Sequence, residues 1–331
     1  MARAEDRKGG ARWPWAVAAV LAVAGMVWVG PRNGLGPDAP ADRPTPPQDL
    51  AQIDAWLAQR EAAVPALRAD VNKRITWHEQ VAALTPWAVV YVHGFSASRL
   101  ETAPLAAELA KALGANLFET RLTGHGQDAR ALGQATVQDW LADMDEALVI
   151  GHRLGQRVLL LSVSTGSTLA TKAGLRPLGR EGVVHVMVSP NFGPRHPLAE
   201  VVNWPWGRQL AGLIEGEMRG GPPANPEEAR VWTSPYPTRA VFPMMALVKH
   251  VRESDLSAFT APVLVFYASG DQTVDPRQTQ GAFERMGSAR KTLSEVRDSE
   301  AAGQHVLAGD VRAPLSTRPM VQGILNWVSG I

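Results

Sequence analysis

The sequence predicts an α/β protein with a mainly parallel central sheet that is covered by helices on both faces. Short β-branched runs alternate with longer amphipathic segments along most of the 331 residues. Several of these runs are apolar throughout, which is typical of strands that are buried on both faces of a sheet. The hydrophobic fraction of 45% is ample for such a core, so a disordered chain is excluded.

The first expected element is a helix over residues 13–30, which contain no charged residue. A helix of this length spans about 27 Å, close to the hydrocarbon thickness of a bilayer. Tryptophans stand at both ends of the run, and four basic residues precede it: Arg3, Arg7, Lys8 and Arg12. This arrangement predicts a transmembrane signal-anchor of the cytoplasmic membrane, with residues 1–12 in the cytoplasm and the remaining chain on the outer side.

A secreted protein is the alternative, with signal cleavage at the small residues 22–24. The uncleaved anchor is favoured, because cleavage would leave the apolar segment 26–30 at the new N-terminus. Residues 31–48 are rich in proline and are expected to form an extended linker. The domain over 49–331 would then begin with a helix that Asp49 caps.

The strands and helices of this domain follow from apolar periodicity and from capping residues. Helices are expected over 102–113, where Gly114 ends the pattern, over 136–154, where Thr136 and Asp139 resemble a capping box, and over 317–328. Strands are expected over 87–93, 116–121, 157–163, 183–189, 262–268 and 292–296. In a parallel sheet, chemistry collects at the carboxyl ends of the strands.

Charge and cysteine content exclude several classes of function. Lys and Arg number 33 against 32 Asp and Glu, a net charge of +1, so no nucleic-acid partner is expected. The absence of cysteine excludes a disulfide scaffold, thiolate catalysis and cysteine-ligated metals. No histidine spacing favours zinc, and we expect no metal and no organic cofactor.

Ser164 is the strongest candidate for a reactive residue. The segment 160–166 reads LLSVSTG, so an apolar strand leads directly into Ser164 and a helix of small residues follows. Ser162 and Gly166, two places to either side, are small enough for a strand and a helix to approach closely. This junction resembles the nucleophile elbow of α/β-hydrolases, with Ser162 in place of the usual glycine.

Two further segments extend the resemblance to the α/β-hydrolase superfamily, and to its monoacylglycerol-lipase-like and carboxylesterase-like branch. Residues 92–96 (VHGFS) resemble the loop that builds the oxyanion hole, which implies backbone N–H donors at Phe95 and Thr165. Residues 120–126 (TRLTGHG) resemble a G-H-G loop of the same branch. The histidines of these loops, His93 and His125, are expected to bind loop backbone rather than act as bases.

The remaining two motifs supply the acid and the base. Residues 268–276 resemble the acid loop of the family, in which Asp271 matches the acid position. Asp275 is the alternative, although it could instead cap a helix that begins at Pro276. Gln304-His305-Val306-Leu307 resembles the late histidine loop, which implies that His305 is the general base. The chain order Ser164, Asp271, His305 is the order of this family.

The strand–helix alternation stops between residues 191 and 256, where Trp, Pro and Met are frequent. Members of this family insert a lid at this point, so the resemblance implies a lid insertion over the site. Its apolar residues are candidates for a substrate pocket; the alternative for each is that it packs the lid on the core. The candidates are Trp204, Trp206, Trp232, Phe242, Met244 and Met245.

The resemblance therefore implies a membrane-anchored serine hydrolase that cleaves carboxylic esters through a Ser164–His305–Asp271 triad and an acyl-enzyme. The substrate would be a small-molecule ester or a lipid ester. A thioesterase or a peptidase would use the same triad, and these alternatives stay open. A hydrolase-like binding protein without catalysis is a further alternative, against which the complete triad argues.

Overall fold

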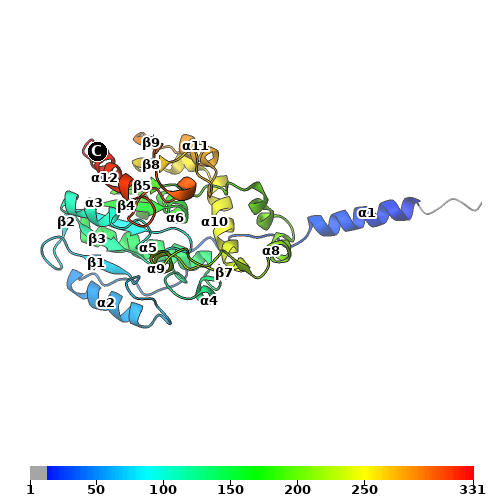
Figure 1. The fold of residues 1–331 in the computed structure, drawn as a ribbon, viewed down its shortest axis with the longest axis horizontal. Coiled ribbons are helices and arrows are strands. Elements are labelled where there is room, and N and C mark those ends of the chain that lie inside the picture. The colour runs from blue at the N-terminus through cyan, green and yellow to red at the C-terminus, as the bar shows by residue number, and fades with distance from the viewer. Residues whose placement is uncertain (1–12) are drawn as a thin grey trace, which may run out of the picture.

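The structure is a computed structural model that describes residues 13–331. The expected cytoplasmic segment 1–12 and its basic residues lie outside the described residues. Helix α1 (Trp13–Trp28) projects from the body of the molecule, and none of its residues is buried (Figure 1). Among the described helices, none has both the length and the apolar character that a bilayer crossing needs. The helix ends at Trp28 rather than at residue 30, since Gly30 and Pro31 follow.

A sheet of seven strands forms the centre of the molecule, in the order β1-β3-β2-β4-β5-β8-β9. All neighbouring strands are parallel except β1, which pairs antiparallel with β3. The predicted mainly parallel sheet is confirmed, whereas the three-residue edge strand β1 was not predicted. The strands are β1 (Arg74–Thr76), β2 (Thr85–Val92), β3 (Asn116–Glu119), β4 (Gly155–Val163), β5 (Val183–Val188), β8 (Val263–Tyr267) and β9 (Lys291–Glu295).

Helices cover both faces of this sheet, as the sequence predicts. Along β2, Val90 and Val92 point into one hydrophobic cluster, whereas Val89 and Tyr91 point into the other. The first cluster includes residues of α5 (Val137–Leu154), α6 (Thr165–Gly174) and α11 (Pro276–Arg285). The second includes residues of α3 (Leu105–Leu113) and α12 (Pro314–Val328). The chain therefore forms a three-layer α/β architecture (Figure 1).

The predicted capping residues begin and end these helices. Asp49 caps α2 (Leu50–Ala62) through the N–H of Ala51, and Thr136 and Asp139 form a complete capping box at α5. Gly114 ends α3 in the left-handed conformation, with φ 60°. Short helices are α4 (Ala129–Leu132), α7 (Pro177–Arg180), η3 (Leu256–Ala258) and η4 (Ala302–Gln304).

Residues 191–256, here called the insertion, interrupt the sheet order between β5 and β8. They contain a two-stranded antiparallel sheet and several helices, and α8 and α10 lie at the end of the body from which α1 projects (Figure 1). The elements are η1 (Pro197–Asn203), α8 (Gly207–Glu215), β6 (Met218–Arg219), α9 (Pro226–Val231), β7 (Tyr236–Pro237), η2 (Thr238–Ala240) and α10 (Val241–Glu253).

The proline-rich residues 31–48 contain no helix or strand, and polar contacts attach them to the body of the molecule. The N–H of Ala41 donates to the carbonyl oxygen of Gln138 at 2.9 Å. Arg43 forms an ion pair with the buried carboxylate of Asp143 at 2.6 Å. An extended segment leaves its backbone groups free to bind elsewhere. Here those groups, together with one arginine, attach the segment to α5.

Candidate active site

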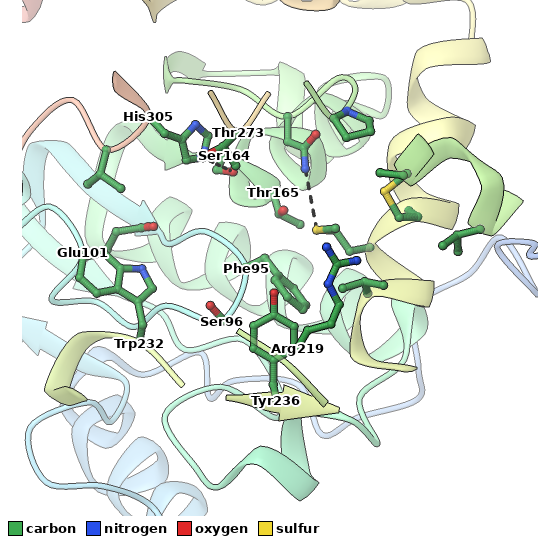
Figure 2. A pocket seen from close by; sticks show the side chains of 18 residues that line it. Phe95, Ser96, Glu101, Ser164, Thr165, Arg219, Trp232, Tyr236, Thr273 and His305 are labelled. Atoms are coloured by element: carbon green, nitrogen blue, oxygen red, sulfur yellow. Dashed lines mark hydrogen bonds between the residues drawn. The ribbon is translucent and has the colours of Figure 1, made fainter. Parts of the chain in front are cut away.

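Ser164 lies at the junction between β4 and α6, in a backbone conformation that non-glycine residues rarely adopt. Its φ is 49° and its ψ is −115°, as a sharp strand-to-helix turn requires. The unusual Ser162 is accommodated because its hydroxyl lies inside the sheet and donates to the carbonyl of Val186 at 3.4 Å. The turn directs the Ser164 side chain into a cavity above the sheet (Figure 2).

The structure brings Ser164, His305 and Asp271 into one chain of hydrogen bonds. Nδ1 of His305 is 2.8 Å from Oδ2 of Asp271, and Nε2 is 3.0 Å from Oγ of Ser164. Since an ionised carboxylate only accepts, Nδ1 carries the hydrogen, which leaves Nε2 to accept from the serine hydroxyl. The three residues follow β4, β8 and β9, whose parallel carboxyl ends meet at one rim of the sheet.

The geometry distinguishes Asp271 from the alternative acid, Asp275. The carboxylate of Asp271 is 2% exposed and also accepts the backbone N–H groups of Thr273 at 2.8 Å and Val274 at 3.0 Å. Asp275 caps α11 instead, where its Oδ1 accepts the N–H of Arg277 at 3.0 Å. Asp271 is therefore the carboxylate that contacts the histidine, and Asp275 is a helix cap.

The predicted oxyanion donors are the backbone N–H groups of Phe95 and Thr165. Both residues line the same cavity as Ser164 and His305. Within residues 13–331 neither N–H has a hydrogen-bond acceptor. Such a pair of unpaired donors beside a serine is the arrangement that stabilises a tetrahedral oxyanion.

His93 supports this loop but takes no part in the hydrogen-bond chain. Its Nδ1 contacts the carbonyl of Gly94 at 2.8 Å, and its Nε2 accepts the N–H of Leu122 at 3.1 Å. Complete burial lowers the pKa of His93 to about 4, so the ring is neutral at physiological pH. His125 likewise contacts a carbonyl, that of Thr123 at 3.1 Å. The expectation that these two histidines bind loop backbone is confirmed.

The cavity at Ser164 has a volume of about 310 Å³ and is lined from both the core and the insertion (Figure 2). Of the six predicted pocket residues, Trp232, Met244 and Met245 line it. Trp204 and Trp206 do not, being 58% and 38% exposed. Phe242 is buried among insertion residues instead. The structure therefore places three of the six candidates away from the cavity, because apolar character alone does not tell which side of a small insertion faces it.

Several polar residues of the cavity were not predicted. Glu101 comes from the core, whereas Asn191, Arg219 and Tyr236 belong to the insertion, the last two to its small sheet. Glu101 lies in the segment between the predicted oxyanion loop and α3, where the sequence does not tell which residues point into the cavity. Nowhere in the described chain do three or more His, Asp or Glu side chains form a group that could hold a metal ion.

The family described as serine aminopeptidase S33 matches residues 85–299, which is well over half of the chain. The chain belongs to the serine aminopeptidase S33 family. As a member of the S33 family it is a serine hydrolase with the α/β-hydrolase fold. The matched range contains Ser164 and Asp271, whereas His305 follows it.

Individual proteins and solved structures are also similar to this chain. A thermostable monoacylglycerol lipase from Bacillus sp. (strain H-257) is 24% identical over 230 residues, which cover 70% of this chain and 87% of that protein. A structure of a metagenome-derived lipolytic enzyme is similar with a TM-score of 0.57 at 18% identity, covering 81% of this chain and 99% of the other. The monoglyceride lipase of Saccharomyces cerevisiae gives a TM-score of 0.57 at 14% identity, with 78% and 90% covered.

Proposed function

We propose that this S33 family member cleaves carboxylic esters of lipid type, with Ser164 as nucleophile, His305 as general base and Asp271 as the group that orients the histidine. The observation that carries the proposal is the hydrogen-bond chain from Asp271 through His305 to Ser164. It ends beside two unpaired N–H groups and at the wall of a cavity. This combination suits acyl transfer, because nucleophile, base and oxyanion donors surround one point.

The reaction would proceed in two halves. Serine is a weak nucleophile at neutral pH, so Nε2 of His305 takes its proton while Oγ attacks the ester carbonyl. The N–H groups of Phe95 and Thr165 stabilise the oxyanion, each contributing about 3 kcal/mol to the transition state. The imidazolium then gives its proton to the leaving alcohol. Water, deprotonated by the same ring, attacks the acyl-enzyme and releases the acid.

The residues that line the cavity suit an apolar acyl group. Val202, Val241, Met244 and Met245 form one side of it, and these residues belong to the insertion. We propose that the insertion is the lid of the enzyme and that the acyl chain lies against these residues. The relatives that are named as monoacylglycerol and monoglyceride lipases support an ester with a single acyl chain.

Labelling with a fluorophosphonate probe, followed by turnover of p-nitrophenyl esters from acetate to laurate, tests this function. We expect labelling of the wild type at Ser164, none in Ser164→Ala, and a rate that rises with acyl length up to a limit. Equal rates on all esters would contradict the acyl pocket. Turnover of aminoacyl p-nitroanilides without turnover of esters would show that the enzyme is a peptidase. Turnover of acyl thioesters without turnover of esters would show that it is a thioesterase.

We further propose that α1 anchors the hydrolase to the cytoplasmic membrane, with the catalytic domain on the outer side. The helix has 16 residues, no charge and no buried side chain, so its apolar surface is exposed. The secreted form after cleavage remains the alternative to this proposal. Extraction of membranes at alkaline pH should leave the full chain in the pellet and release a variant with Val20→Arg and Leu21→Arg. Recovery of a shortened wild-type protein in the medium would favour cleavage.

A further inference from the structure

Glu101 is a buried carboxyl group beside the triad for which the mechanism above has no use. The residue is 3% exposed and lines the same cavity as Ser164 and His305 (Figure 2). Its Oε2 accepts the backbone N–H of Gly94 at 2.7 Å. A Cβ atom on Gly94 would lie 2.9 Å from Oε1 of Glu101 and 3.2 Å from Cβ of Ser164. The carboxyl group and the nucleophile thus both lie close to the position that a side chain of Gly94 would occupy.

The backbone around Glu101 also connects the oxyanion loop to the histidine loop. A Cβ atom on Gly309, four residues after His305, would lie 3.0 Å from the carbonyl oxygen of Glu101. The N–H of Asp310 donates to the carbonyl of Ala103 at 2.8 Å. Glu101 therefore lies where the loop of the oxyanion donor Phe95 meets the loop of the base.

A hydrogen bond to Gly94 does not by itself explain a glutamate at this position. The amide oxygen of a glutamine would accept the same N–H, and a neutral amide costs less to bury than a carboxylate. A buried acid is retained here although the loop needs only an acceptor. What glutamate adds over glutamine is its negative charge, which makes the carboxylate a stronger acceptor for the Gly94 N–H.

We propose that Glu101 is a positioning residue of the ester hydrolysis: its carboxylate accepts the N–H of Gly94 and thereby holds the oxyanion loop that carries Phe95. The inference rests on the proposed function, since it concerns the same Ser164 site. It assigns to the active site a second carboxylate in addition to Asp271.

The electrostatics of the surroundings agree with this role. Burial raises the pKa of Glu101 to about 7, against the Gly94 hydrogen bond and the positive charge on His305, which act to lower it. Glu101 is therefore ionised above neutrality.

The other groups around Glu101 do not compete for this role near neutral pH. From β2, the phenol of Tyr91 is fully buried, and burial together with Glu101 keeps its pKa well above the ordinary value. From the insertion, the Trp232 side chain lies beside the carboxyl group and acts to lower its pKa. Arg312 lies over the Trp232 ring and is paired with Glu228 at 3.0 Å.

The test compares Glu101→Gln, which keeps an acceptor for Gly94, with Glu101→Ala, which does not. In Glu101→Gln the Gly94 N–H keeps a weaker, neutral acceptor, so we expect kcat to stay within about threefold of the wild type. In Glu101→Ala we expect kcat to fall roughly 10- to 100-fold, with a smaller change in KM, because the oxyanion donor loses its support.

The split between kcat and KM, and the rescue by glutamine, separate a positioning role from a general loss of stability. Glu119→Gln is the matched control for Glu101→Gln, because it removes a buried carboxylate that pairs with Arg74 and Arg99 away from the cavity; it should leave kcat and KM unchanged. A kcat of folded Glu101→Ala within about threefold of the wild type would overturn the proposal, even in an enzyme that hydrolyses esters. Failure to hydrolyse any ester would instead overturn the proposed function.

Discussion

A Cβ atom on Gly166 would lie 2.5 Å from the carbonyl oxygen of Val92, the last residue of the strand beside the one that leads into Ser164. It would also lie 2.6 Å from the carbonyl oxygen of His93. Helix α6 therefore begins in contact with the backbone of β2, and only a hydrogen atom fits between them. This contact is the physical reason why a small residue must follow the reactive serine by two positions.

Replacement of Gly166 by alanine should consequently destabilise the protein. The added methyl group meets backbone oxygens that cannot rotate away, so we expect the free energy of unfolding to fall by about 2 kcal/mol or more. Urea denaturation measures the change. Gly281→Ala in α11 is the control, since nothing lies within 4 Å of its Cβ position; it should gain roughly 0.5 to 1 kcal/mol from helix propensity. Equal effects of the two substitutions would contradict the close contact at Gly166.

The two acids of the loop after β8 should respond differently to the same change. Asp271→Asn replaces the acceptor for Nδ1 of His305 and should lower kcat by roughly 10³- to 10⁴-fold, because the ring loses its orientation and tautomer. Asp275→Asn keeps a good N-cap for α11 and should leave kcat within about twofold of the wild type. Steady-state kinetics on an activated ester distinguish them. A larger loss at Asp275 would mean that the acid has been misassigned.

Acyl preference should depend on Met244, which lines the cavity at Ser164. Its side chain lies beside Asn191, whose Nδ2 is 3.8 Å from the Met244 sulfur. Met244→Trp adds volume there, so we expect the preferred p-nitrophenyl ester to become shorter and turnover of the acetate to change little. Leu213→Trp on α8 is the control, because Leu213 is 83% exposed and does not line the cavity. A similar shift in both variants would argue against an acyl chain at Met244.

Acid should destabilise the fold through histidines that are buried in the neutral form. His185 of β5 is fully buried, and burial lowers its pKa to about 4. Since its pKa in the unfolded chain is about 6.5, the unfolded state binds more protons between these values, and stability falls as the pH falls through that window.

His185→Gln, which can still donate to the carbonyl of Gly179, should remove this contribution. Between pH 7.5 and pH 5 the wild type should therefore lose about 2 kcal/mol more than the variant, as measured by urea denaturation at each pH. The exposed His196 offers the control variant His196→Gln, which should follow the wild type. Parallel curves for wild type and His185→Gln would show that His185 is not the acid-sensitive group.

Much of the fold was predictable because its signals are local. Alternating strand and helix patterns predicted the parallel sheet. The motifs around Ser164, Asp271 and His305, and their order in the chain, predicted which three residues meet at its rim. Trp206 could not be placed, because its contact with the backbone of Pro31 depends on how two distant segments pack. Glu101 was missed for a similar reason: whether a charged residue is buried is decided by the tertiary structure around it.

Residues 31–48 determine how far the hydrolase can move from whatever α1 binds. The side chain of Asn33 donates to Asn203 at 3.1 Å and to the carbonyl of Phe242 at 2.8 Å, both in the insertion. Together with the Arg43 ion pair, these contacts fix a segment that would otherwise be a flexible tether. The hydrolase domain would then keep one orientation relative to α1 and would not rotate freely around it.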